Sequence, residues 1–201
     1  RLYPVERGHI FIDGIDINDL PLAILRGNIG FVPQDNFLFS ATIKDNIRFF
    51  TNHFTEEEVE EAAKFSSVYD NIMDFPAGFE TKVGERGITL SGGQKQRVSI
   101  ARAIIKNPSI LILDDSLSAV DTKTEEEILS NIKKLLKERT GIIIAHRVST
   151  IKHADQIIVL EDGRIIEEGN HQELMKQKGY YYKLYSTQLV ENRLEEVGDI
   201  V

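Results

Sequence analysis

Two short runs of consecutive apolar residues, with an amphipathic segment between them, limit this chain to few folds. The runs cover residues 110–113 (ILIL) and 141–145 (GIIIA). Strands that are apolar throughout, rather than at alternate positions, are typical of a parallel sheet with both faces covered. Residues 122–138 have an apolar stripe at helical spacing, with Thr122 and Glu125 in the register of a capping box. A strand, a helix and a second strand of this kind predict an α/β fold with a mostly parallel core sheet.

Asp-Gly pairs and a proline mark the other predicted strands. Apolar residues flank an Asp-Gly pair, which favours a two-residue hairpin turn, in residues 9–17 and again in residues 156–168. Residues 29–33 form a short apolar run that ends at Pro33, and Gln34 follows in a loop. The hairpin at residues 9–17 is therefore expected to add an antiparallel β element to the parallel core.

The stretch after these first strands has a mainly helical character. Residues 55–74 are predicted to form a helix, because Thr55 and Glu58 stand in capping-box register and acidic residues fill the first turn. Phe37 and Phe39 are expected to lie exposed on a loop or short helix. We interpret the chain as one α/β domain with an inserted helical lobe, divided into a β element and strand (1–34), the helical lobe (35–105), a strand–helix–strand core (106–170) and a helical tail (171–201).

Composition narrows the partners that such a domain could bind. The chain has no Cys, so neither disulfides nor thiolate metal sites can form. The net charge of −8 argues against nucleic acid as a main partner, because phosphate backbones are bound by basic surfaces. No apolar run approaches the roughly 18 residues that a membrane-spanning helix needs. These residues are therefore expected to lie outside the bilayer.

Residues 90–94 (LSGGQ) directly precede a predicted helix and expose backbone. Gly92 and Gly93 carry no side chains, and residues 95–105 have the composition of a good helix. The first N–H groups of a helix lack partners within it, and the positive end of the helix dipole points to the same place. This arrangement predicts an anion site, with a phosphate as its ligand, formed by Ser91, Gly92, Gly93 and Gln94.

Two carboxylates follow the first apolar strand. Asp114 and Asp115 would be delivered to the carboxyl edge of the sheet, where open α/β sheets bind ligands. Asp114 could there hold Mg²⁺, usually through water, and Asp115 could orient or deprotonate an attacking water. The alternative is that both residues merely solvate the end of a strand. The motif alone leaves the two interpretations balanced.

Three more polar residues indicate a function only in combination with these motifs. His146 ends the second apolar strand, and its imidazole could donate a hydrogen bond to a γ-phosphate, although a histidine in such a place is usually a surface residue. The Gln34 carboxamide could meet a metal-bound water. Asp121 could simply cap the helix that follows it.

Together, these motifs resemble the ATP-binding cassette (ABC) ATPases in order and in spacing, along the whole chain. The LSGGQ stretch resembles the signature motif of that family, and ILILD at residues 110–114 resembles its Walker B strand. Gln34 corresponds to the Q-loop, Asp121 to the D-loop and His146 to the switch histidine. The loop at residues 81–87 and the tail that begins at Gly169 resemble ABC exporters in particular.

The resemblance implies a P-loop NTPase-like fold and a paired site. Two cassettes dimerise head to tail, and each ATP, with Mg²⁺, lies between the Walker motifs of one subunit and the signature motif of the other. Ser91, Gly92 and Gly93 would then contact the γ-phosphate of ATP held by a partner cassette. Closing of the dimer would drive a transmembrane domain that exports multidrug or lipid-like substrates. The contact with that domain would lie near Gln34 and residues 37–39, at the cytoplasmic face of the cell membrane.

The sequence departs from the family pattern in two ways, of which the first is a missing motif. The phosphate-binding loop G-x-x-x-x-G-K-[ST] is absent, since no Lys follows a Gly anywhere in the chain. The family places that loop, with the first strands, upstream of the hairpin at residues 9–17, so the chain is expected to be a truncated cassette. Without the loop, the polypeptide alone is expected to bind Mg-ATP weakly and not to hydrolyse it.

The second departure is Asp115, where the family usually has Glu. Aspartate is one methylene shorter, which displaces the carboxylate by about 1 Å and can cost on the order of 10²-fold in rate. An intact LSGGQ beside this Asp resembles the subunit of bacterial heterodimeric multidrug exporters whose own ATP site is degenerate. A homodimer that uses Asp slowly is the alternative. A soluble ABC ATPase of the DNA-repair or translation-factor type and a non-hydrolysing regulatory nucleotide-binding subunit are further candidate functions.

Overall fold

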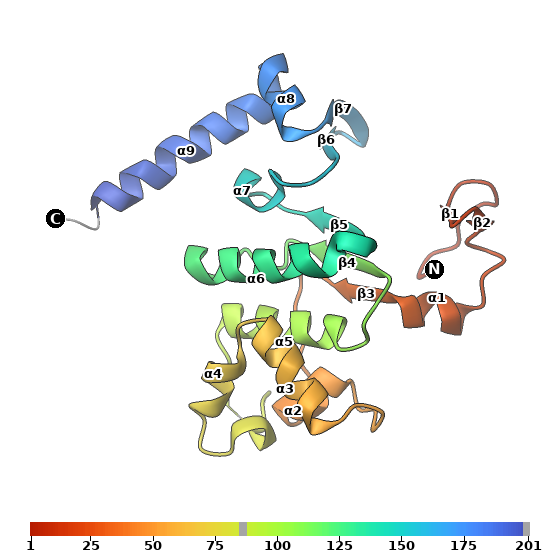
Figure 1. Cartoon of the computed structure of the whole chain (residues 1–201), viewed down its shortest axis with the longest axis vertical. Coiled ribbons are helices and arrows are strands. Elements are labelled where there is room, and N and C mark those ends of the chain that lie inside the picture. Colours follow the sequence, from red (N-terminus) through yellow and green to blue (C-terminus); the bar gives the residue numbers. More distant parts are fainter. Residues whose placement is uncertain (85–87, 199–201) are drawn as a thin grey trace. The chain divides into compact units, whose positions relative to one another are not determined.

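The computed structural model describes residues 1–84 and 88–198, with side chains as far as residue 191, and it divides into two compact units (Figure 1). The first unit covers Arg1–Ile142 and the second Ile143–Val201. Each unit has its own cluster of buried apolar side chains. Strands and helices alternate along the chain, in a three-stranded sheet with parallel pairing and two antiparallel strand pairs. This arrangement confirms the predicted α/β fold.

The first unit contains a hairpin, the main part of the three-stranded sheet and a group of helices. Its elements in chain order are β1 (Phe11–Ile12), β2 (Ile15–Asp16), α1 (Leu22–Asn28), β3 (Ile29–Val32), α2 (Ile43–Arg48), α3 (Glu56–Phe65), α4 (Tyr69–Met73), η1 (Gly78–Glu80), α5 (Gly92–Ile104), β4 (Ile110–Asp114), α6 (Thr122–Leu135) and η2 (Leu136–Glu138). Strand β5 (Thr140–Ile144) begins in this unit. The strand order in the sheet is β3-β4-β5.

The β3–β4 pair is the buried part of this sheet. The two strands run parallel, with Val32 opposite Leu113. Val32, Leu111 and Leu113 are all buried. Because the strands are parallel, their carboxyl ends lie together at one edge of the sheet. The polar residues that follow each strand are therefore brought to the same place.

Strand β5 differs from its prediction. The sequence predicted a second buried strand at residues 141–145, whereas Ile142 and Ile144 are 48% and 51% exposed. Among the described residues, β5 is an outer strand of its sheet, with β4 on one side of it. It therefore has fewer neighbours to cover its side chains than β4 has.

The predicted helix at residues 55–74 is two helices. Its start is confirmed, because Thr55 caps α3 in a capping box with Glu58. However, α3 ends at Phe65, and Ser67 has a φ of +53° before α4 begins. The buried Ser66 hydroxyl donates to the carbonyl of Ala62, one turn earlier. A serine that bonds to its own helix in this way competes with the regular backbone pattern, which favours an end at this point.

Helix α6 confirms the predicted amphipathic helix but begins at a different cap. Ile128 and Ile132 are buried on its apolar side. The Asp121 carboxylate accepts the N–H of Thr124 at 3.0 Å, so Asp121 is the N-cap. The predicted capping box of Thr122 and Glu125 is therefore wrong. Aspartate is the stronger cap of the two candidates, and the helix begins one residue earlier than that box requires.

As far as residue 198, the second unit contains a hairpin and three helices. Its elements are α7 (Val148–Ile151), β6 (Ile157–Glu161), β7 (Arg164–Gly169), α8 (His171–Gln177) and α9 (Tyr180–Gly198). Strands β6 and β7 pair antiparallel around Asp162 and Gly163, which both have positive φ. Asp13 and Gly14 have the same conformation between β1 and β2. Both predicted Asp-Gly hairpins are thus confirmed. The core of this unit is formed by Val148, Ile157, Leu174 and Tyr181.

Candidate functional site

The start of α5 is organised by a capping box. The Ser91 hydroxyl accepts the N–H of Gln94 at 3.2 Å, and the Gln94 side-chain oxygen accepts the N–H of Ser91 at 2.9 Å. The first N–H groups of a helix have no acceptor within that helix, so those of Gly92 and Gly93 can donate to a ligand. The Ser91 O–H can donate as well, because its oxygen is used only as an acceptor in the box. This helix start has the donors and the polarity that an anion needs.

The two glycines also let α5 lie close to a loop of the same chain. A Cβ on Gly93 would stand 2.7 Å from the carbonyl oxygen of Ala119, closer than real Cβ atoms come to other atoms. A Cβ on Gly92 would stand 3.3 Å from the Cβ of Ala119. Glycine at position 93 is therefore required by packing within the chain, in addition to any need to expose its N–H.

The carboxyl ends of β3 and β4 bring Gln34, Asp114 and Asp115 to one edge of the sheet. Since Val32 is paired with Leu113, Gln34 follows β3 at the level where Asp114 ends β4 and Asp115 follows it. Gln34 is exposed, and both aspartates are half-buried. Asp115 has a φ of +44°, a left-handed conformation that residues other than glycine seldom adopt. Such strained residues persist where surrounding contacts hold them, and they cluster at functional sites.

Gln96, two residues after the LSGGQ stretch, connects α5 to the turn that follows β4. Its Nε2 group donates to Ser118 Oγ at 3.2 Å and lies 3.5 Å from the carbonyl oxygen of Asp115. Its Oε1 atom accepts the N–H of Ala119 at 3.0 Å. Sequence reasoning missed Gln96, because a glutamine inside a helix carries no signal until its distant partners are known.

Asp121 is the last residue of the same loop and directly precedes α6. Its hydrogen bonds with Thr124 lower the pKa of its carboxyl group, and the guanidinium of Arg97 lowers that pKa further. Arg97 extends from α5 and donates to the carbonyl oxygens of Ser67 and of Gly93. The capping role of Asp121 is thus real. It also places a negative charge close to the helix that carries the two glycines.

His146 follows β5 and belongs to the second unit, where α9 holds its backbone. Gln188 of α9 donates from Nε2 to the carbonyl oxygen of His146 at 2.8 Å. The Oε1 atom of Gln188 accepts the N–H of Val148, also at 2.8 Å. The backbone on both sides of Arg147 is therefore fixed by one carboxamide. The hydrogen bond from His146 to a γ-phosphate stays a prediction.

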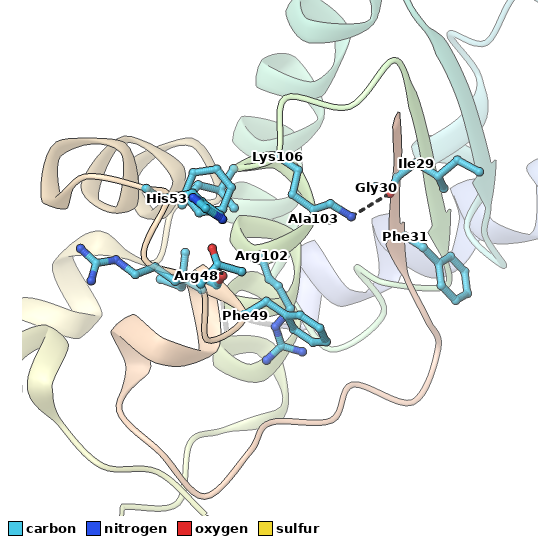
Figure 2. Close-up of a pocket in the computed structure, with 13 residues that line it drawn as sticks. Ile29, Gly30, Phe31, Arg48, Phe49, His53, Arg102, Ala103 and Lys106 are labelled. Carbon is cyan, nitrogen blue, oxygen red and sulfur yellow. Dashed lines mark hydrogen bonds between the residues drawn. The ribbon is translucent and has the colours of Figure 1, made fainter. Parts of the chain in front are cut away.

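A pocket of about 340 Å³ lies between β3 and the helices α2 and α5 (Figure 2). Figure 2 shows Lys106, just after α5, reaching toward β3, where its Nζ donates to the carbonyl oxygen of Ile29 at 3.3 Å. The pocket combines aromatic and basic side chains. Its lining residues of these two kinds are Phe31, Arg48, Phe49, His53, Phe54, Arg102 and Lys106.

Arg102 of α5 ties the loop after Gln34 to α2. Its guanidinium donates to the carbonyl oxygen of Asn46 at 2.7 Å, to Asn46 Oδ1 at 2.9 Å and to the carbonyl oxygen of Phe37 at 3.0 Å. It also lies 5.8 Å from the centre of the Phe39 ring. Burial lowers the pKa of Arg102 to about 10, so the group stays charged at neutral pH.

The aromatic residues after Gln34 differ from their prediction at one position. Phe37 is 65% exposed, as predicted. Phe39 is half-buried, with its ring 5.0 Å from that of Phe37 and 5.1 Å from that of Phe50. Asn46 holds the backbone of Phe39, since it accepts the N–H at 2.8 Å and donates to the carbonyl oxygen at 3.0 Å. The ring is half-buried because other aromatic rings pack on it, and these contacts join residues that are up to eleven positions apart.

The model of a protein family described as ABC transporter matches residues 1–118, which is more than half of the chain. The chain belongs to the ABC transporter family. A putative multidrug export ATP-binding/permease protein of Staphylococcus aureus (strain NCTC 8325) is 52% identical to it over 188 residues, which are 94% of this chain. The putative multidrug export ATP-binding/permease protein YgaD of Bacillus subtilis is 51% identical over the same length.

A solved structure has the same fold as this ABC transporter chain. It is described as a bacterial Atm1-family ABC exporter with ATP bound, and it matches with a TM-score of 0.84 and 46% sequence identity. The match covers 89% of this chain and 32% of that one. The chain likewise spans 32% of the length of the two curated relatives.

Membership of the ABC transporter family confirms the resemblance drawn from the motifs. In the exporter-like loop at residues 81–87, residues 85–87 lie outside the described residues. None of the helices in the described part of the chain has the length and hydropathy of a bilayer-spanning segment. The same part holds no group of three or more acidic or histidine side chains placed to bind a metal ion.

Proposed function

We propose that the chain is the ATP-binding domain of an ABC exporter, in which ATP binding and hydrolysis are coupled to transport of multidrug or lipid-like substrates. One observation carries this proposal: helix α5, which begins at the LSGGQ stretch, packs against the loop that follows Asp114 and Asp115. The glycine-containing start of α5 lies against Ala119, and Gln96 of α5 bonds to the turn after Asp115. The LSGGQ stretch can bind a phosphate, and the two aspartates can hold Mg²⁺ and an attacking water. The exporter names of the similar proteins support the same function.

The residues at the carboxyl edge of the sheet fit Mg-ATP chemistry. Mg²⁺ usually takes one or two carboxylates and completes its shell with waters and substrate phosphates, which suits Asp114 with Gln34 nearby. The ion, when bound, would neutralise charge on the phosphates. Asp115 would orient or deprotonate the attacking water, and His146 would donate a hydrogen bond to the γ-phosphate.

The start of α5 suits a ligand that is held by a second cassette. Ser91, Gly92 and Gly93 present donors, while Gln94 is used to hold Ser91 in place. In a head-to-tail dimer these donors would contact the γ-phosphate of ATP bound to the partner cassette. Asp121, which caps α6 beside them, would face the same interface. This chain would thus contribute to two ATP sites, its own and its partner's.

The pocket between β3 and the helices suits contact with the transmembrane domain. It adjoins the loop after Gln34, since Arg102 lines the pocket and bonds to Phe37. Phe31 and Phe49 leave about half of their surface exposed there, which offers apolar area to a partner. We expect a cytoplasmic segment of the transmembrane domain to dock at this place. The domain would then work at the cytoplasmic face of the membrane.

The 201-residue chain by itself is expected to bind Mg-ATP weakly. Its sequence holds no G-x-x-x-x-G-K-[ST] motif, which supplies the backbone cradle and the Lys for the phosphates. Isothermal titration of the chain with Mg-ATP should therefore give no saturable binding at micromolar ATP, and the chain should show no ATP hydrolysis. The full-length exporter is the positive control. Micromolar affinity of the isolated chain would contradict this expectation.

Asp115 is expected to limit hydrolysis at the chain's own ATP site. Glutamate at this position would extend the carboxylate by about 1 Å toward the water, a displacement that can be worth on the order of 10²-fold in rate. In the full-length exporter, with the partner's site disabled, Asp115→Glu should therefore raise the rate of ATP hydrolysis. Asp115→Asn is the matched control and should lower it. Equal rates with Asp and Glu would rule out a degenerate site and a heterodimer built around it.

A further inference from the structure

We infer that Gln96 is a positioning residue that transmits the position of the α5 start to the backbone of Asp115. The inference rests on the proposed function for the ligands of those two places, while the contacts that carry it lie within the chain. The start of α5 would contact ATP held by a partner cassette, and Asp115 would lie at the ATP of its own cassette. Gln96 would then link the two ATP sites through one side chain.

The carboxamide of Gln96 is bonded at both ends to the same loop. Its Nε2 group donates to Ser118 Oγ and approaches the carbonyl oxygen of Asp115, and its Oε1 accepts the N–H of Ala119. The residue is 6% exposed, so water cannot readily replace these partners. A buried carboxamide with both its donor and its acceptor occupied has a single orientation. A shift of α5 is therefore passed to the loop rather than absorbed by rotation of the side chain.

The turn that receives these bonds is held in a strained conformation. Asp115 has a φ of +44°, and its carbonyl oxygen also accepts the hydroxyl of Ser118 at 3.0 Å. A residue other than glycine keeps this conformation only where its surroundings fix it. Loss of the Gln96 contacts would let the turn relax, and the Asp115 carboxylate would move with its backbone.

The start of α5 has a second contact with this loop, which makes the link stiff. Gly93 leaves no room for even one extra carbon beside the carbonyl oxygen of Ala119. The helix start and the loop are thus in van der Waals contact at Gly93 and hydrogen-bonded at Gln96. A phosphate that displaces the helix start must displace Ala119 and, through Gln96, the backbone of Asp115.

Two substitutions at Gln96 in the full-length exporter, with the partner's site disabled as in the Asp115 test, separate the donor from the acceptor. Gln96→Leu is similar in size and removes both, whereas Gln96→Glu keeps the acceptor for the Ala119 N–H and loses the donors toward Ser118 and Asp115. Both variants should lower kcat on the order of 10-fold and change the KM for ATP by less than about twofold, because a misplaced Asp115 affects the reaction rather than binding. A wild-type kcat in Gln96→Glu would overturn the link to Asp115.

Val98→Ala is the matched control for a general loss of stability. Val98 lies on the same helix, is fully buried and packs in the core of the helical region. This variant should unfold more easily than the wild type and yet keep kcat within about twofold. A loss of kcat in Val98→Ala as large as that in Gln96→Leu would assign the effect to destabilisation and overturn the inference.

Hydrogen exchange of the Ala119 amide tests the contact without relying on ATP hydrolysis. In the 201-residue chain, Gln96→Leu should speed exchange at Ala119 on the order of 10-fold, while Gln96→Glu should leave it near the wild-type rate. Unchanged exchange in Gln96→Leu would overturn the contact. A wild-type exporter that does not hydrolyse ATP would contradict the proposed function, whereas a normal kcat for Gln96→Leu in an active exporter would contradict this inference alone.

Discussion

Gly93 meets two demands at one position. Its backbone N–H is among those that the start of α5 can offer to a ligand. Its lack of a side chain lets the carbonyl oxygen of Ala119 lie against the helix. A phosphate site made of N–H groups would tolerate alanine at position 93, because the backbone donor is unchanged. The packing against Ala119 would not tolerate it, because the added Cβ would clash with the carbonyl oxygen. Comparison of Gly93 with Gly92 separates the two demands.

Gly93→Ala should lower the free energy of unfolding by about 1–3 kcal/mol, the usual cost of forcing an extra carbon into a packed region. Gly92→Ala is the control, because its Cβ would meet only the Cβ of Ala119 at 3.3 Å and the residue is exposed. Its effect should stay within about 0.5 kcal/mol. Urea titrations followed by circular dichroism measure both. Equal effects at the two positions would show that Ala119 does not restrict residue 93.

Several element boundaries were predictable from the sequence because local chemistry sets them. Thr55 begins α3, and the two Asp-Gly pairs turn their hairpins, because each acts on residues within a few positions. Two boundary predictions failed although the deciding contacts are local, at Ser66 and at Asp121, and the other failures come from contacts between distant residues. The Phe39 ring is covered in part by Phe50, eleven positions later, and Gln96 has its partners after β4. A single sequence gives no indication of such pairs, so the motifs were found and the residues that support them were not.

Arg102 of α5 is hydrogen-bonded both to α2 and to the loop after Gln34, and the forked shape of its guanidinium makes this possible. The guanidinium reaches two oxygens of Asn46 and the carbonyl of Phe37 from one position on α5. The ammonium of lysine is a single point charge and cannot reach all three oxygens in that fork-like arrangement. Arg102→Lys should therefore leave buried acceptors unpaired and lower the free energy of unfolding by about 2 kcal/mol.

Arg26→Lys is the control for the Arg102 prediction, since Arg26 is exposed in the last turn of α1. It should change the free energy of unfolding by less than about 0.5 kcal/mol. Chemical denaturation of both variants gives the comparison. If Arg102→Lys is no more destabilised than Arg26→Lys, the three hydrogen bonds do not hold the loop after Gln34. The docking surface proposed beside that loop would then lose its support.

At the scale of the whole chain, the buried apolar side chains form separate clusters in the two units. Ile43 belongs to the cluster of the first unit, and Leu174 to that of the second. Both side chains are 0% exposed. Each cluster draws on elements of its own unit, so each can be weakened without removing a side chain from the other. The sequence predicted the strands of both units and many of the helices, though not α1 or α7, and it did not predict this division, because a boundary in the middle of β5 has no local signal.

The separate cores predict two unfolding transitions in calorimetry of the 201-residue chain. Ile43→Ala and Leu174→Ala each remove a fully buried aliphatic side chain, which costs about 2–5 kcal/mol. Ile43→Ala should lower the Tm of one transition and Leu174→Ala that of the other, and hydrogen exchange should assign each transition to its unit. A single transition that both variants lower equally would show that the units unfold together. Separate transitions would mean that the helix carrying Gly93 and Gln96 and the segment carrying His146 are stabilised independently. Coupling between them would then require the cassette dimer, because the start of α5 is proposed to contact the partner's ATP and His146 the ATP of its own cassette.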